Sequence, residues 1–137
     1  MRKNAQPPEN LFPDYRRAAI RRLDAARHLA LSEYRLEAVY LAGYAVECML
    51  KAWIVRSTPK SKHSQIIQLF RGNRGHSFEF LRKQLWEMGC LKRGEAIPEF
   101  HRVSGWSTDF RYAVKLPRAQ DMKTFLDAAA RIVNWIE

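Results

Sequence analysis

Residues 38–55, AVYLAGYAVECMLKAWIV, are apolar around nearly the whole circumference of a helix, and only Glu47 and Lys51 interrupt the run. A helix that is apolar on all sides must be covered by other helices, by a partner chain or by lipid. Two charges in a membrane span would each cost roughly 2.5–3.5 kcal/mol, and the run is barely long enough to cross a bilayer. The pattern therefore predicts a buried central helix, and we expect no membrane association.

Polar and aromatic side chains form a stripe along one face of this helix. They recur at steps of three and four residues, which bring side chains to the same face. The members of the stripe are Tyr40, Gly43 or Tyr44, Glu47 and Lys51. The acid precedes the base by four residues, which is the favourable order for an ion pair within a helix. The stripe is interpreted either as a solvated or interface-facing seam or as the lining of a functional groove, and the spacing alone does not decide.

The segment before the central helix predicts a first long helix. Asp14 is expected to cap it, and it should run to about Leu31. A short polar break at residues 32–35 then predicts an antiparallel hairpin with the central helix. The apolar positions expected to face the core are Ala19, Ile20, Leu23, Ala26, Leu29 and Ala30.

The second half of the chain predicts two more long helices and short pieces between them. Ser77 is expected to cap a helix that ends at Gly89. Its apolar face would comprise Phe78, Leu81, Leu85 and Met88. Residues 64–70 and a segment opened by Pro98 predict short helices. The clearest helical period of the chain belongs to the last helix, with Met122, Phe125, Leu126, Ala129, Val133 and Ile136.

No run of strands and no internal repeat is visible, so the predicted fold is all-α. We expect an up-and-down helical bundle of four long helices plus one or two short ones. The 137 residues suit one domain, which we place at residues 14–137 after a polar, proline-bearing lead-in at residues 1–13.

The charge balance narrows the class of partner. The chain has 24 Lys and Arg against 14 Asp and Glu, a formal net charge of +10. From Cys48 to Phe78 it contains no acidic residue. A basic domain of this size attracts polyanions, chiefly nucleic acid, nucleotides or an acidic protein partner, but charge does not choose among them.

Cysteine and histidine spacing gives no sign of a metal or a cofactor. Cys48 and Cys90 lie far apart, in neither a metal-binding nor a redox spacing, which favours inert thiols in a reducing compartment. The four histidines show no paired spacing on one helix, so no metal site is expected. The N-terminus lacks the apolar core of a signal peptide, and we therefore expect a cytoplasmic protein.

Arginine followed by histidine is the only pattern that suggests catalysis. An imidazole near a guanidinium could cleave RNA, with the histidine moving a proton and the arginine stabilising phosphate charge. Arg71 with His76 is one candidate pair, and Arg111 with a spatially close His101 is another. Because the chain holds many arginines, such spacings also arise by coincidence, and His76 could instead satisfy backbone groups before its helix.

The segment WSTDFRY, residues 106–112, is the second candidate site. Asp109 and Arg111 flank aromatic rings, and Arg beside Trp106 or Tyr112 could hold a base by stacking and a phosphate by charge. The alternative is an Asp–Arg ion pair that pins an ordered loop to the core.

These segments together resemble one family. YLAGYAVECMLKAWI, residues 40–54, is similar to the signature helix of HEPN domains, and the preceding segment from Asp14 resembles that family's first hairpin. GHSFEFL, residues 75–81, resembles its histidine-headed third helix, and WSTDFRY resembles its Trp and Arg-Tyr segment before the last helix.

The resemblance implies a helical homodimer associated with nucleotide or RNA binding. Many relatives are ribonuclease toxins in host defence, often silenced by a nucleotidyltransferase partner, and their motif is Arg, four to six residues, then His before the last helix. Here Arg111 is followed by Tyr112 and by no histidine, which argues against ribonuclease activity. For Arg111 and Tyr112 the resemblance implies a binding role alone.

The leading hypothesis is therefore a dimeric HEPN-like module that binds nucleotide or RNA. Its expected ligand-binding residues are Tyr44, Glu47, Lys51, Trp106, Asp109, Arg111 and Tyr112, with His76 beside them. The alternatives are a metal-independent ribonuclease that uses His76, Arg71 or His101, and a non-catalytic adaptor for an acidic protein. A dimer is also expected because one hairpin and two further helices could leave part of residues 38–55 uncovered.

Overall fold

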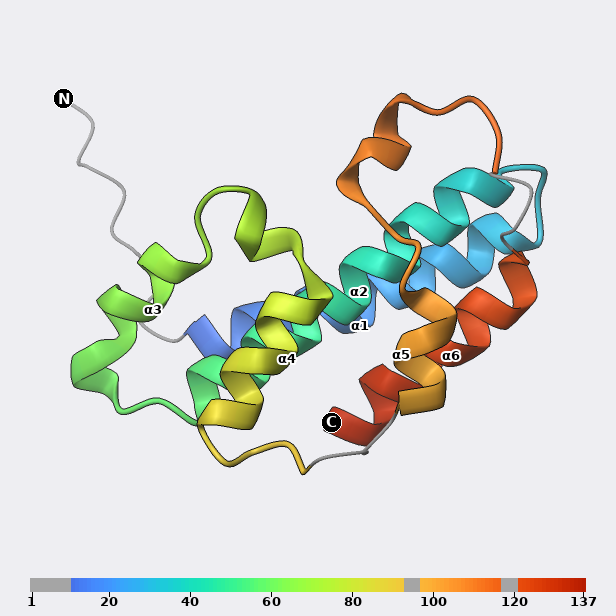
Figure 1. The fold of residues 1–137 in the computed structure, drawn as a ribbon. Helices are drawn as coiled ribbons and strands as arrows, with labels where there is room; N and C mark the ends of the chain where they lie inside the picture. Colours follow the sequence, from blue (N-terminus) through green and yellow to red (C-terminus); the bar gives the residue numbers. More distant parts are fainter. Residues whose placement is uncertain (1–10, 93–96, 117–120) are drawn as a thin grey trace, which may run out of the picture.

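The computed structural model describes residues 11–92, 97–116 and 121–137 (Figure 1). Within these ranges the chain forms six α-helices and three short 3₁₀ segments, and no strand. The helices are α1 Leu11–Ala30, α2 Arg35–Arg56, α3 His63–Leu69, α4 Phe78–Glu87, α5 Ile97–Val103 and α6 Met122–Ile136. The 3₁₀ segments are η1 Lys60–Lys62, η2 Asn73–His76 and η3 Thr108–Tyr112. The prediction of an all-α bundle with four long helices and additional short ones is confirmed.

Helix α2 lies at the centre of the bundle, as its apolar run predicts. Of its 22 residues 15 are buried, and α1, α4 and α6 all pack against it. By length and hydropathy α2 is the one helix in the described ranges that could cross a membrane, but 78% of its most apolar stretch is covered by the rest of the chain. The bundle itself therefore satisfies the need of this helix for an apolar environment.

The single chain covers most, but not all, of the central helix. Part of residues 38–55 does remain uncovered in the single chain, as expected: Tyr40, Leu41, Tyr44 and Trp53 are partly exposed, whereas Val39, Val46 and Leu50 on one face of α2 have no exposed surface. The loop after α5 adds cover through Trp106 and η3, which both contact α2. A homodimer stays a prediction, which rests on the family resemblance and on this partial exposure.

The first helix differs from its prediction at two points. It begins at Leu11, so Asp14 lies within the first turn rather than at the cap. Its negative charge still interacts favourably with the positive N-terminal end of the helix dipole. Residues 11–13 belong to the helix rather than to the lead-in, whose residues 1–10 lie outside the described ranges. Ile20 is 39% exposed, because α1 packs mainly on α2 and α6 and buries the narrow face of Ala19, Leu23 and Ala26.

The predicted capping groups of the later helices are present. The Ser77 hydroxyl accepts a hydrogen bond from the Phe80 backbone N–H at 3.2 Å, which is an N-cap for α4. Gly89 follows α4 with φ at +77°, a left-handed conformation that favours glycine. Met88 lies beyond the last residue of α4 and is 37% exposed, so its expected core position is wrong. The predicted core face of α6 is confirmed from Phe125 to Ile136.

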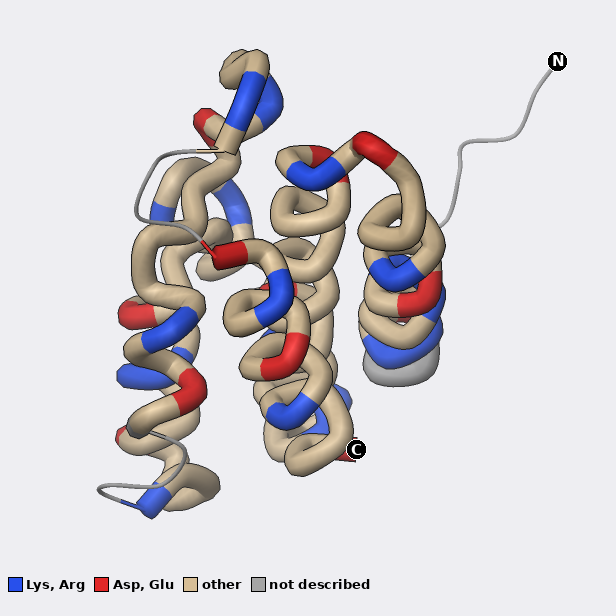
Figure 2. Tube along the Cα trace, turned by 90° about the vertical axis from the view of Figure 1, so that its right-hand side faces the viewer, with Lys and Arg blue, Asp and Glu red and all other residues tan. Residues whose placement is uncertain are grey.

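Charged residues are spread over the bundle. Figure 2 shows Lys and Arg on several helices, interleaved with Asp and Glu. Figure 1 shows α3 and the turns around it at the end of the bundle away from α5 and α6. That end of the molecule carries most of the acid-free segment between Cys48 and Phe78.

Candidate functional site

The polar stripe of α2 is an interior feature. Glu47 and Lys51 are only 3% and 6% exposed, and the Lys51 Nζ donates to Glu47 Oε2 at 2.9 Å. The same ammonium lies 5.2 Å from the centre of the Phe70 ring. The predicted ion pair is confirmed, but the interpretation of a solvated seam is wrong, because the segment between α3 and α4 covers it. A ligand could not reach either charge directly in this conformation.

His76 connects this buried pair to the surface. It ends η2, and its Nδ1 donates to Glu47 Oε1 at 3.0 Å, so one carboxylate holds both Lys51 and His76. The histidine side chain is 40% exposed, whereas that of Glu47 is 4% exposed. Within the described chain Nε2 of His76 has no hydrogen-bond partner. A carboxylate that fixes one ring nitrogen leaves the other in a defined position to accept or donate a proton.

Trp106 packs against the turn of α2 that carries Tyr40 and Gly43. Its Nε1 donates to the Tyr40 carbonyl at 3.1 Å, and a Cβ on Gly43 would lie 2.0 Å from that nitrogen, so only glycine fits there. The indole also stacks on Phe78, with an interplanar angle of 7° and 5.2 Å between ring centres. Trp106 is 7% exposed. Its predicted role as a stacking platform for a base is therefore wrong, because the buried ring already stacks on Phe78 and on Tyr40.

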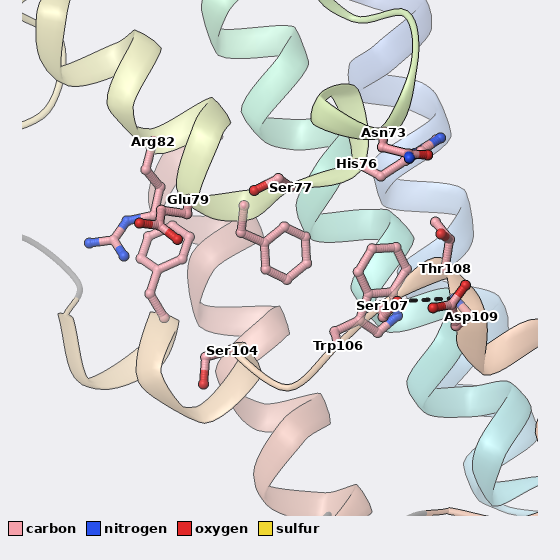
Figure 3. Close-up of a pocket in the computed structure, with 12 residues that line it drawn as sticks. Asn73, His76, Ser77, Glu79, Arg82, Ser104, Trp106, Ser107, Thr108 and Asp109 are labelled. Carbon is pink, nitrogen blue, oxygen red and sulfur yellow. Dashed lines mark hydrogen bonds between the residues drawn. The ribbon is translucent and has the colours of Figure 1, made fainter.

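A pocket of about 600 Å³ opens beside these groups, at the start of α4 (Figure 3). Its lining residues come from η2, α4, α5 and the segment up to η3, and they are Asn73, His76, Ser77, Phe78, Glu79, Arg82, Phe100, Ser104, Trp106, Ser107, Thr108 and Asp109. Figure 3 shows Arg82 and Glu79 at one end and His76, Thr108 and Asp109 at the other. The three segments that the sequence singled out, at residues 40–54, 75–81 and 106–112, thus meet at one place.

Arg82 is the most distinctive of the several pocket residues that the sequence prediction missed. Its guanidinium lies 4.2 Å from the centre of the Phe100 ring, and its Nε is buried with no hydrogen-bond partner. Burial lowers the pKa of the guanidinium, an effect that the charge of Glu79 opposes. No carboxylate of the described chain forms an ion pair with it. The sequence did hold a signal for Arg82. It follows Phe78 by four residues and therefore lies on the apolar side of α4.

The predicted arginine–histidine pairs are not formed. Arg71 is exposed and forms no hydrogen bond with His76 in the described chain, since His76 pairs with Glu47 instead. His101 is exposed on α5 and lines a smaller hollow next to the main pocket, together with Arg82, Phe100 and Ser104. No hydrogen bond or ion pair joins it to Arg111 in the described chain.

Arg111 and Tyr112 lie outside the lining of the main pocket. Both are exposed, and the guanidinium sits 4.9 Å from the centre of the Tyr112 ring. Asp109 does line the pocket; its backbone N–H donates to the Ser107 hydroxyl, and the expected ion pair with Arg111 is not formed between these described residues.

Tyr44 packs edge-on against both Trp106 and His76, and burial raises its pKa to about 12, so its hydroxyl remains protonated.

The described ranges hold no group of three or more His, Cys, Asp and Glu side chains that could bind a metal ion. Both cysteines are free, and burial together with the nearby charge of Glu47 raises the pKa of Cys48 to about 11. The polar side chains that line the pocket offer hydroxyls, one amide, one imidazole, two carboxylates and one guanidinium, together with the indole N–H of Trp106.

The fold and the pocket define a small helical bundle whose central helix carries a buried carboxylate linked to a surface histidine. The family model of the HEPN domain matches residues 12–137, nearly the whole chain. The chain therefore belongs to the HEPN family, as its motifs predicted. No curated protein and no solved structure matches it.

Proposed function

We propose that this HEPN-domain protein binds a nucleotide or RNA in the pocket at the start of α4. The observation that carries the proposal is Arg82, a charged group on the pocket wall whose Nε is buried without an acceptor. An unsatisfied buried donor costs about 1–3 kcal/mol, and more in a charged group. A phosphate oxygen in the pocket would remove that cost and would accept from the planar guanidinium in a favourable geometry.

The other lining groups suit the rest of a nucleotide. Ser77 caps α4, whose free backbone N–H groups and positive dipole end favour an anion. Glu79 and Asp109 add two carboxylates, which would repel a bare polyphosphate but can accept hydrogen bonds from a base or a ribose. The mixture favours a ligand with one phosphate near Arg82 and with N–H or O–H donors toward Asp109.

Binding of AMP, ATP and single-stranded RNA, measured by calorimetry or fluorescence anisotropy, tests the proposal. Arg82→Met should weaken binding about tenfold or more, because a charged hydrogen bond contributes about 1.5–3 kcal/mol. Lys83→Met is the matched control, since it removes the same charge from the adjacent, exposed position of α4. Equal affinities for the two variants would overturn the assignment of the pocket.

A second candidate function is metal-independent RNA cleavage, and the Glu47–His76 pair favours it. Glu47 would hold the imidazole, and Nε2 of His76 would take a proton from the attacking hydroxyl. RNA cleavage in the presence of EDTA should fall about 10²- to 10⁴-fold in His76→Ala. His101→Ala serves as the control. Unchanged cleavage in His76→Ala, or no cleavage by the wild type, would eliminate this function.

The partners follow from the family resemblance and belong to the same proposal. We expect a cytoplasmic homodimer that acts in a defence or toxin–antitoxin setting with a nucleotidyltransferase. Light scattering tests the dimer, and a monomer at micromolar concentration would contradict it. If the protein binds an acidic protein in a salt-sensitive way but neither RNA nor nucleotide, the adaptor alternative replaces the leading one.

A further inference from the structure

The turns on either side of α3 carry an uncompensated positive charge. Four basic residues there are exposed, namely Lys60 and Lys62 in η1 and Arg71 and Arg74 around η2. None of them forms an ion pair within the described chain, and no acidic residue occurs between Cys48 and Phe78. Elsewhere on the described chain Lys and Arg occur on the same helices as Asp and Glu (Figure 2). We name these four residues the basic rim.

The basic rim has two parts separated by α3. A seven-residue helix spans about 10 Å, so the two lysines and the two arginines are too far apart to share one phosphate. They can instead contact successive phosphates of an extended strand. None of the large apolar side chains exposed on the described chain lies between Ser57 and Ser77, so this surface has nothing to insert into a membrane.

The arginine part of the rim is fixed and leads into the pocket. Gly72 has φ at +80°, and a Cβ on Gly75 would lie 1.9 Å from the Phe70 carbonyl oxygen. The shape of this turn therefore requires glycine at both positions. The guanidinium of Arg74 lies 5.0 Å from the centre of the Phe80 ring on α4. Asn73 and His76 of the same turn line the pocket.

We propose that the basic rim binds the phosphate backbone of a single-stranded RNA whose end lies in the pocket. The inference rests on the proposed function, because the pocket supplies the site for that end. It adds that the ligand is an oligonucleotide rather than a free nucleotide, and that the strand runs from Arg82 past Arg74 and Arg71 toward η1. The rim supplies affinity without sequence preference, as backbone contacts do.

The test compares an RNA of about 12 nucleotides with a mononucleotide, each titrated over a range of salt concentrations. The rim variant carries Lys60→Gln, Lys62→Gln, Arg71→Gln and Arg74→Gln. The control variant carries Arg27→Gln, Arg35→Gln, Lys123→Gln and Arg131→Gln, which removes the same charge at exposed positions away from α3. Circular dichroism establishes that both variants fold.

The rim variant should bind the mononucleotide as the wild type does but bind the RNA at least about tenfold more weakly. Each lost phosphate contact lowers the salt dependence of binding by about 0.7, so four contacts lower it by roughly 3. Equal effects of the rim and control variants would overturn the inference, as would wild-type protein that binds RNA no more tightly than the mononucleotide. Wild-type protein that binds neither ligand would refute the proposed function itself, and rim-dependent binding to anionic vesicles in place of RNA would assign the surface to lipid.

Discussion

Gly43 and Trp106 are in such close contact that a Cβ on Gly43 would lie 2.0 Å from the indole Nε1. The same nitrogen donates to the Tyr40 carbonyl, so α2 and the loop after α5 are joined at this point. Trp106 also forms part of the pocket wall. Because Gly43 has no side chain, Trp106 can pack close to α2. This contact sets the position of one wall of the pocket.

Gly43→Ala should therefore destabilise the protein by about 1–3 kcal/mol, because the added methyl displaces the indole from a packed site. Urea denaturation followed by tryptophan fluorescence measures the loss. In a Trp106→Ala background the same substitution should be nearly neutral, since the clashing ring is gone. Equal costs in the two backgrounds would mean that the contact does not constrain the loop.

Glu47→Ala should destabilise the fold by about 3–5 kcal/mol, because it leaves the Lys51 ammonium buried without a partner. Glu47→Ala combined with Lys51→Met should recover most of the loss, as an apolar pair can replace a buried ion pair. The exposed pair Lys83 and Glu87, at 4.0 Å, is the control, and its removal should change the free energy of unfolding by only a few tenths of a kcal/mol. Similar losses at the two pairs would contradict the burial of Glu47.

The sequence was sufficient to predict the helices and the central position of α2, because both follow from apolar periodicity and from capping residues such as Ser77. It could also single out His76 and Trp106. It could not show that Glu47 and Lys51 lie inside, because an i,i+4 ion pair looks the same on a surface and under a covering loop. It could not pick out Arg82 either, since the missing acceptor at Nε becomes visible only once α4 and α5 are placed together.

Cys48 should react slowly with thiol reagents near neutral pH, since its pKa is raised to about 11 and the side chain is buried, while the half-buried Cys90 reacts first. The same shift affects stability. Between the ordinary value of 9.0 and about 11 the unfolded thiol loses its proton before the folded one, so stability falls as pH rises through this range. Cys48→Ala should remove that part of the decline. An unchanged pH profile in the variant would contradict the assignment.

Ser77→Ala should cost about 1 kcal/mol, because it removes the acceptor for the Phe80 N–H at the start of α4. Ser77→Asp keeps a capping acceptor and should retain most of the stability. It also places a negative charge at the mouth of the pocket, and it should therefore weaken the binding of a phosphate ligand. Thermal unfolding and RNA titration of the two variants check this separation, and tighter RNA binding by Ser77→Asp would contradict an anion site there.

The most direct test of the central claim is an NMR titration of the isotope-labelled protein with a short 5′-phosphorylated RNA. Chemical-shift changes should gather at Asn73, Ser77, Arg82 and Thr108, including the Arg82 side-chain Nε–H. Shifts confined to other surfaces, or no shifts at a saturating concentration of RNA, would contradict the central claim.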